Sequence, residues 1–146
     1  MSGFRFSLEK ALDLRRLQLE LEESRFQQQA AALRELDRRR DDMRTSRANA
    51  EAQVRAGGWA QGLDLAALGA FRLHVQAGEK NLAQRRVEGE KKLEERRNAM
   101  LEARRRCRLL ERLKERRKGE WDTAFNRELE AVAAESFLAQ WNRGQS

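Results

Sequence analysis

Positions that are mostly occupied by apolar residues recur every seven residues through the first third of the chain. Each repeat has two such positions three residues apart, which is typical of a helix that packs along one seam against another helix. The hydroxyl of Ser7 can accept a hydrogen bond from a first-turn N–H group, so the pattern predicts a helix from about residue 5 to about 55. The two rows of the repeat contain Leu12, Leu19, Phe26, Leu33, Arg40, Arg47 and Val54, and Leu8, Arg15, Glu22, Gln29, Leu36, Met43 and Ala50.

A second repeat of the same period follows the densest group of glycines, in the segment RAGGWAQGLD. Asp64 is a suitable N-cap for it, so the sequence predicts a turn at about residues 57–63 and a second helix from about 64 to about 142. Charged residues interrupt both rows. One row contains Leu65, Arg72, Glu79, Arg86, Leu93, Met100, Cys107, Lys114 and Trp121, and the other Leu68, Val75, Leu82, Gly89, Arg96, Ala103, Leu110, Arg117, Ala124, Ala131 and Leu138.

Two long helices joined by a short turn pack antiparallel. The sequence therefore predicts an all-α fold, an antiparallel two-helix coiled-coil hairpin formed by residues 1–146 as a single domain. If the turn centres near residue 60, the first helix ends opposite about residues 115–120. From about Trp121 onward the longer second helix should overhang without a partner helix. The chain has no proline, which leaves both helices free of interior breaks.

Composition narrows the class of protein and its compartment. Aromatic residues make up 6% of the chain and charged residues 38%, which leaves little material for a wide core. The single cysteine, Cys107, excludes an intramolecular disulfide and fits a reducing compartment. The longest apolar runs are far below the roughly 20 residues that span a bilayer, and the N-terminus lacks the apolar core of an export signal. We expect a cytoplasmic protein without membrane insertion.

No group of residues in the sequence predicts catalysis. His74 and Cys107 are the only histidine and the only cysteine, and they lie too far apart on one helix to meet within a monomer. The glycines of GGWAQG are followed by no Lys-Ser/Thr pair, so they do not form a phosphate-binding loop. The sequence predicts no enzyme activity, no metal site and no cofactor.

The basic stretch from residue 85 to 118 contains fifteen Lys/Arg and seven Glu residues, and it accounts for the net charge of +7 of the whole chain. Its charges suit a solvated helix face with ion pairs at i, i+3 and i+4. They also suit a nucleic-acid backbone, an acidic protein groove or a membrane surface. The stretch has no interleaved Tyr or Phe for base stacking, so docking to an acidic protein is favoured. The apolar anchors for such docking would be Leu109, Leu110, Leu113 and Trp121.

Two segments carry a resemblance to a known family. FRFSLEKALDLRRLQLE, at residues 4–20, resembles the opening of the FliJ family, the soluble stalk proteins of the bacterial flagellar type III export apparatus. LLERLKERRKGEWDTAFNRELEAVAAESF, at residues 109–137, resembles the other end of the same family. The length, the absence of proline and the expected two-helix architecture agree with it over the full chain.

The resemblance implies a non-enzymatic stalk that inserts into the hexameric ring of the export ATPase and promotes its assembly. The other implied partners are the export gate in the membrane and the export chaperones, at a peripheral location on the inner face of the cell membrane. The alternatives left open are the stalk of an injectisome and an RNA-binding helical hairpin. The implied ring-binding residues are Phe6, Leu8, Leu12, Arg15, Arg105, Arg108, Arg112, Arg116 and Arg117, and the implied gate-binding residues are Phe71, Val75, Gly78 and Leu82.

Overall fold

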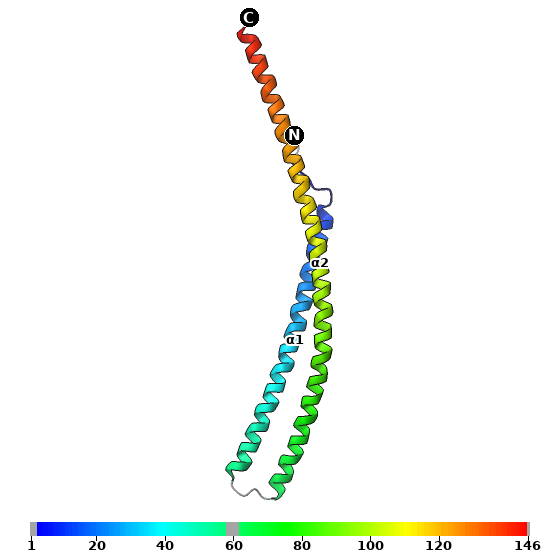
Figure 1. Ribbon diagram of the computed structural model, residues 1–146, viewed down its shortest axis with the longest axis vertical. Helices are drawn as coiled ribbons and strands as arrows, with labels where there is room; N and C mark the ends of the chain where they lie inside the picture. Colours follow the sequence, from blue (N-terminus) through cyan, green and yellow to red (C-terminus); the bar gives the residue numbers. More distant parts are fainter. Residues whose placement is uncertain (1–2, 58–61, 146) are drawn as a thin grey trace. The chain divides into compact units, whose positions relative to one another are not determined.

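The computed structural model describes residues 3–57 and 62–145 of the chain. It consists of two helices, α1 (Glu9–Ala56) and the longer α2 (Gly62–Gly144), which pack antiparallel as a hairpin (Figure 1). The predicted all-α hairpin fold is confirmed. Most of the predicted turn, residues 58–61, lies outside the described residues. Because α2 begins at Gly62, Asp64 lies inside the helix and does not occupy the predicted N-cap.

Backbone hydrogen bonds define the beginning of α1. The N–H of Glu9 donates to the carbonyl of Phe6 at 3.2 Å, and the N–H of Leu12 donates to that of Leu8 at 2.9 Å. Leu8 therefore occupies the N-cap position, one residue later than the predicted Ser7. The carboxylate of Glu9 in the first turn interacts favourably with the positive end of the helix dipole.

The chain divides into two compact units. The loop unit comprises residues 20–101, and the terminal unit comprises residues 1–19 together with residues 102–146. Each unit contains a length of α1 and a length of α2. The organisation of residues 1–146 as a single domain stays a prediction.

Ion pairs between the helices establish the register within each unit. In the loop unit Arg86 pairs with Asp37, and the Nε of Arg72 lies 3.0 Å from Oε1 of Glu51. In the terminal unit the Nζ of Lys114 lies 2.9 Å from Oε2 of Glu9. The two members of each pair are numbered symmetrically about a point between residues 61 and 62, close to the predicted centre near residue 60.

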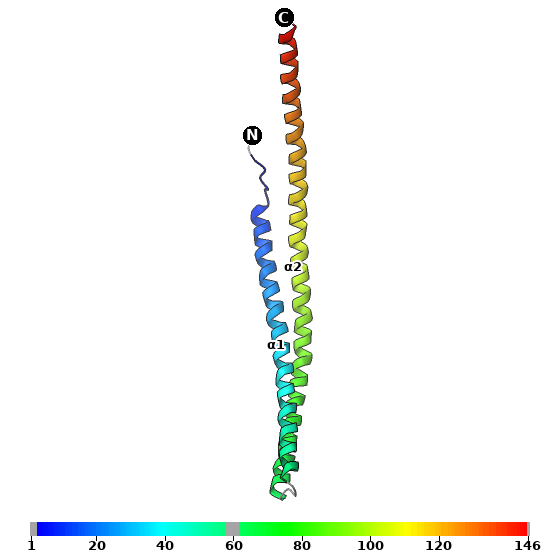
Figure 2. The ribbon, with the colours of Figure 1, turned by 90° about the vertical axis from the view of Figure 1, so that its left-hand side faces the viewer.

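The core of the loop unit is one narrow seam, formed where α1 and α2 lie side by side (Figures 1 and 2). Leu33 of α1 and Val75 and Leu82 of α2 are buried there. The guanidinium of Arg97 stacks over the ring of Phe26, 5.8 Å from its centroid. These side chains belong to the predicted seam rows, apart from Arg97, which lies beside them.

Two glycines let the helices of the loop unit approach closely. A Cβ atom at Gly78 would lie 2.6 Å from the terminal methyl carbon of Met43, and one at Gly89 would lie 2.6 Å from Cδ2 of Leu33. The side-chain amide of Gln29 donates to the carbonyl of Gly89 at 3.1 Å. At these two positions the missing side chain makes room for a side chain of α1.

The core of the terminal unit is formed by Leu12 of α1, which is 0% exposed, and by Ala103 and Cys107 of α2. The thiol of Cys107 is 3.5 Å from Oε1 of Glu111, to which it donates. Burial, reinforced by the negative charge of Glu111, raises the pKa of this thiol above its ordinary value. Cys107 is buried in the seam, in agreement with its place in one of the predicted seam rows.

An aromatic cluster marks the end of the pairing in the terminal unit. The ring of Trp121 stacks on that of Phe125 at 5.0 Å between centroids, and Phe4 packs against Trp121 at 6.3 Å. Beyond Phe125 every described residue of α2 is exposed. This part, residues 126–144, is the orange to red end of the ribbon in Figure 2, and we call it the overhang. It begins close to the predicted position at Trp121.

Candidate docking surfaces

Four arginines of the terminal unit form a basic stripe on α2. Arg105, Arg108, Arg112 and Arg116 follow one another at spacings of three, four and four residues, so they lie on one face of the helix. All four are exposed. The buried Cys107 and the half-buried Lys114 lie on the opposite face, which α1 covers. The stripe therefore points away from the seam.

Several cations of this region already have carboxylate partners. Arg105 and Arg106 both donate to Glu102 at 2.7–3.0 Å, and Arg116 lies 4.0 Å from Glu120. The hydrogen bonds from Arg105 and then Arg106 lower the pKa of Glu102 to about 2, from an ordinary value of 4.5.

Other cations of the same region have no such partner. Among the residues that the structure describes, Arg108, Arg112 and Arg117 form no ion pair, which leaves three cations available to an acidic partner. An arginine guanidinium can bind a carboxylate through two parallel hydrogen bonds, so this surface suits acidic side chains.

The structure places the N-terminal residues with an implied ring-binding role in the same unit as the basic stripe. Besides the pair of Glu9 with Lys114, the Nε of Arg16 lies 3.6 Å from Oε1 of Glu111. The individual residues differ in access: Leu8 is exposed, Phe6 and Arg15 are half-buried, and Leu12 is fully buried in the seam. Ring binding by these residues stays a prediction, in which Leu12 can act only by supporting the surface.

The residues with an implied gate-binding role lie in the loop unit. Val75 and Leu82 are buried in the seam, and Gly78 faces Met43 of α1. Phe71 is half-buried. Gate binding through these residues stays a prediction, and a partner could reach Val75 or Leu82 only after α1 had moved away from them.

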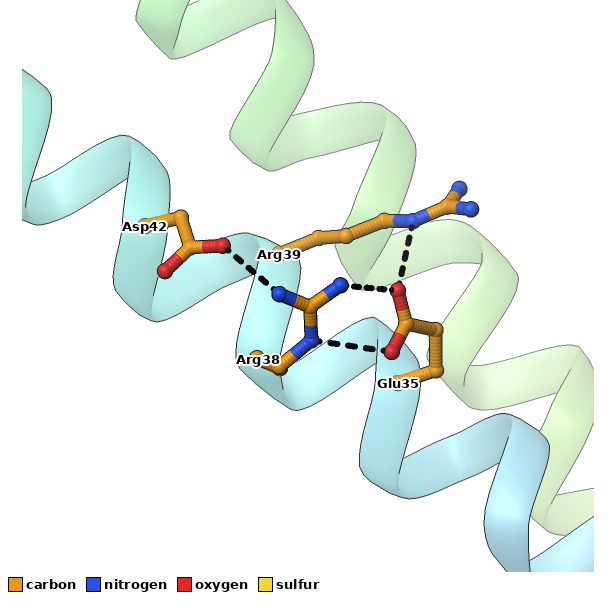
Figure 3. Close-up of polar contacts among 4 residues, drawn as sticks. All are labelled: Glu35, Arg38, Arg39 and Asp42. Atoms are coloured by element: carbon orange, nitrogen blue, oxygen red, sulfur yellow. Dashed lines mark hydrogen bonds and ion pairs between the residues drawn. The ribbon is translucent and has the colours of Figure 1, made fainter.

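A charged network on α1 of the loop unit illustrates the solvated faces of the hairpin (Figure 3). Arg38 donates from Nε and from one terminal nitrogen to the two carboxylate oxygens of Glu35, at 2.9 and 2.7 Å. Arg39 lies 3.5 Å from the same carboxylate, and Arg38 also reaches Asp42 at 3.4 Å. The hydrogen bond from Arg38 is the largest cause of the lowered pKa of Glu35. Such exposed pairs stabilise a helix only slightly.

The candidate groups for other chemistry are dispersed. His74 is exposed, and Cys107 is a buried free thiol. In residues 3–57 and 62–145 no three His, Cys, Asp or Glu side chains gather in a way that could hold a metal ion. Neither helix, over the part of the chain that is described, has a segment long and apolar enough to cross a membrane.

The aromatic cluster is a feature that sequence reasoning missed in part. The sequence places Trp121 in a seam row, but it gives no role to Phe4 or to Phe125. A signal was present, since Trp121 and Phe125 are four residues apart and therefore meet on one helix face. The sequence likewise contained the spacing of Arg105, Arg108, Arg112 and Arg116, which places them on one face of the helix.

Comparison of the chain with models of protein families, with curated proteins and with solved structures finds no match in any of the three.

Proposed function

We propose that the protein is a non-enzymatic stalk of a flagellar type III export apparatus, which binds the hexameric export ATPase through the terminal unit. The observation that carries the proposal is the outward basic stripe of Arg105, Arg108, Arg112 and Arg116 in the unit that also holds the family-like N-terminal segment. The two-helix hairpin agrees with the architecture that the family resemblance implies. Contacts with the export gate and with export chaperones belong to the same proposal.

Binding in this proposal is electrostatic in its first stage. The unpaired Arg108, Arg112 and Arg117, at i, i+4 and i+9, present several guanidinium groups to acidic side chains that line a ring. Such charge complementarity accelerates encounter and fixes orientation, while apolar contacts from Leu8 and Phe6 would add affinity. The protein itself needs no catalytic group for this role, because the hydrolysis takes place in the ATPase.

The test is the rate of ATP hydrolysis by a purified flagellar export ATPase, titrated with the full chain at fixed salt. We expect the rate to rise and to saturate well below one chain per ATPase subunit. The variant Arg112→Glu/Arg116→Glu/Arg117→Glu should keep its helicity and lose this stimulation. A flat titration with the wild-type chain would contradict the proposal.

A matched control variant distinguishes binding through a specific surface from binding that depends only on the net charge of the chain. Arg85, Lys91 and Lys92 are exposed cations of α2 in the loop unit, so Arg85→Glu/Lys91→Glu/Lys92→Glu changes the net charge by the same amount. We expect this control to stimulate the ATPase as the wild type does. If both triple variants lose stimulation equally, binding depends on overall charge and the basic stripe has no special role.

The unpaired arginines also favour a second candidate function, an RNA-binding hairpin, because phosphates and carboxylates attract the same groups. A salt titration does not separate the two functions, since either partner releases counterions. A measurement of the affinity for a labelled single-stranded RNA does separate them. Tight RNA binding together with a flat ATPase titration would select this second function, and an ATPase from an injectisome used in parallel would test the third alternative.

A further inference from the structure

An exposed apolar stripe runs along the overhang of α2. Leu129 is 49% exposed and Val132 is 56% exposed. Trp121, Phe125, Leu129 and Val132 are separated by four, four and three residues, so they occupy one face of the helix. We call these four residues the apolar stripe. Its first half is partly covered by Phe4, and its second half is covered by no described residue.

The apolar stripe continues the seam of the hairpin. Leu110, Trp121 and Val132 follow at intervals of eleven residues, which correspond to three helical turns, so they lie on the same face. Cys107 and Ala103, which are buried against α1, belong to this face as well. α1 begins at Glu9, and its N-terminal segment extends the cover as far as Trp121 through Phe4. In the described part of the chain, the face of α2 that packs against α1 and its N-terminal segment as far as Trp121 is therefore uncovered beyond Trp121, where a second helix could pack.

The charge around the apolar stripe is acidic. Residues 120–135 contain five acidic side chains and one arginine, in contrast to the basic stretch that precedes them. Glu128 and Glu135 are exposed, lie seven residues apart and flank the stripe on one side. Neither of them is part of an ion pair or hydrogen bond among the described residues. In two-stranded coils, charges at seven-residue spacing beside the seam select the partner helix.

A second copy of the same chain fits this surface poorly. Two copies of residues 120–135 laid against each other would bring two sets of five acidic side chains together, with one arginine each to offset them. Like charges beside a helix–helix seam oppose association. The complementary occupant is a helix with basic flanks.

We propose that the apolar stripe and its acidic flank form a docking site for a basic amphipathic helix of a partner protein, which continues the seam of α1. The partner helix would place Leu, Ile or Val side chains on Phe125, Leu129 and Val132. Its lysines or arginines, spaced by seven residues, would pair with Glu128 and Glu135. The proposal uses neither the basic stripe nor the export ATPase, so it stands apart from the proposed function.

The test is a titration of the full chain with a synthetic peptide of about three heptads, with leucine at the seam positions and lysine at the flanking positions. Fluorescence anisotropy of the labelled peptide measures its affinity. We expect saturable binding to the wild-type chain. Leu129→Ser/Val132→Ser and Glu128→Lys/Glu135→Lys should each weaken it by at least about tenfold, because a tenfold change corresponds to the loss of a single good contact. The same peptide with glutamine in place of lysine should bind about tenfold more weakly to the wild type.

A matched control lies on the other side of the overhang. Phe137 and Trp141 are exposed and, by their spacing, point away from the apolar stripe. Phe137→Ser/Trp141→Ser removes at least as much apolar surface and should leave the peptide affinity unchanged. The replaced side chains are all exposed, and far-UV circular dichroism checks that the helices persist in each variant.

Three outcomes would overturn the proposal. The first is an absence of binding to the wild-type chain, and the second is an equal loss of affinity in the control and in Leu129→Ser/Val132→Ser. The third is a concentration-dependent dimer in sedimentation of the chain alone that disappears in Leu129→Ser/Val132→Ser, because a second copy would then be the occupant.

Discussion

The close packing of Gly89 against Leu33 provides a sensitive test of the hairpin. Replacing Gly89 by alanine adds a Cβ atom that would lie 2.6 Å from Cδ2 of Leu33 and 3.5 Å from Nε2 of Gln29. Leu33 is buried in the seam, so its methyl group must shift among packed side chains to admit the new Cβ atom. If the helices packed in another register, Gly89 would be an ordinary helical glycine and alanine would be preferred there.

Two effects of opposite sign determine the result. Alanine in place of glycine in a helix interior stabilises by about 1 kcal/mol, because it restricts the unfolded chain and exposes less backbone. Inserting a methyl group into a packed seam costs about 1–3 kcal/mol. We therefore expect the Gly89→Ala variant to range from nearly unchanged to about 2 kcal/mol less stable. Gly69 of the same unit has nothing within 4 Å of an added Cβ, so Gly69→Ala should show only the stabilising effect.

The measurement is unfolding in urea, followed by far-UV circular dichroism at one pH and one salt concentration. The difference in the free energy of unfolding between the two variants should be about 1–3 kcal/mol, with Gly69→Ala the more stable. Gly89→Ala should become stabilising when Leu33 is also replaced by alanine, since the clash is then removed. Equal stabilisation by Gly69→Ala and Gly89→Ala in the wild-type background would refute the packing of Gly89 on Leu33.

Three further outcomes are expected. Leu12→Ala, at the most buried position, should lower the free energy of unfolding by about 2–5 kcal/mol, whereas Leu17→Ala, at a position 63% exposed, should change it by less than about 0.5 kcal/mol in urea unfolding. The lowered pKa of Glu102 means that its contribution to stability is present above pH 4.5 and is lost as the pH falls toward 2. A carbon-13 titration of this carboxyl should have its midpoint well below pH 4.5, and Arg105→Gln should raise the midpoint. The thiol of Cys107 should react with a thiol reagent at pH 8 far more slowly in the folded chain than in urea, because it is buried and its pKa is raised.

Much of the fold could be predicted because the repeat of seven is simple. The rows that define the predicted seam contain the residues that the structure buries, among them Leu12 and Leu33 in the first helix and Val75 and Leu82 in the second. The charged members of the rows were harder to interpret. Arg86 looks like an interruption in the sequence, yet its long side chain extends out of the seam and pairs with an acidic residue of α1.

The helix ends were less predictable, since several residues near each end can cap a helix. Ser7 and Asp64 are both good N-cap residues by type, but the helices begin at Glu9 and Gly62. A capping preference of about 1 kcal/mol does not fix the first residue of a helix, and helix ends commonly shift by one or two residues.

The candidate surfaces show where a sequence pattern becomes ambiguous. An apolar residue at helical spacing can pack inside the hairpin or contact a partner, and the sequence alone does not distinguish these uses. Leu12, Val75 and Leu82 carry implied binding roles from the family resemblance, and all three are buried between α1 and α2. The outward arginines are different, because their spacing places them on one face whatever the register of the seam.

The basic stripe and the apolar stripe of the terminal unit lie on opposite faces of α2, so a partner on one does not obstruct the other. Arg105 and Arg112 point away from the face that contains Cys107, whereas Trp121 and Val132 continue that face. The charges also differ in sign, because the basic stripe consists of arginines and the apolar stripe is flanked by glutamates. An acidic partner therefore suits only the basic stripe, and a basic partner suits only the apolar stripe. It follows that the two proposed interactions should separate in mutants. Arg112→Glu/Arg116→Glu/Arg117→Glu, which reverses two charges of the basic stripe and that of Arg117, should abolish stimulation of the ATPase without changing peptide affinity, and Leu129→Ser/Val132→Ser should do the reverse. Loss of both activities in either variant would mean that the two stripes form one surface.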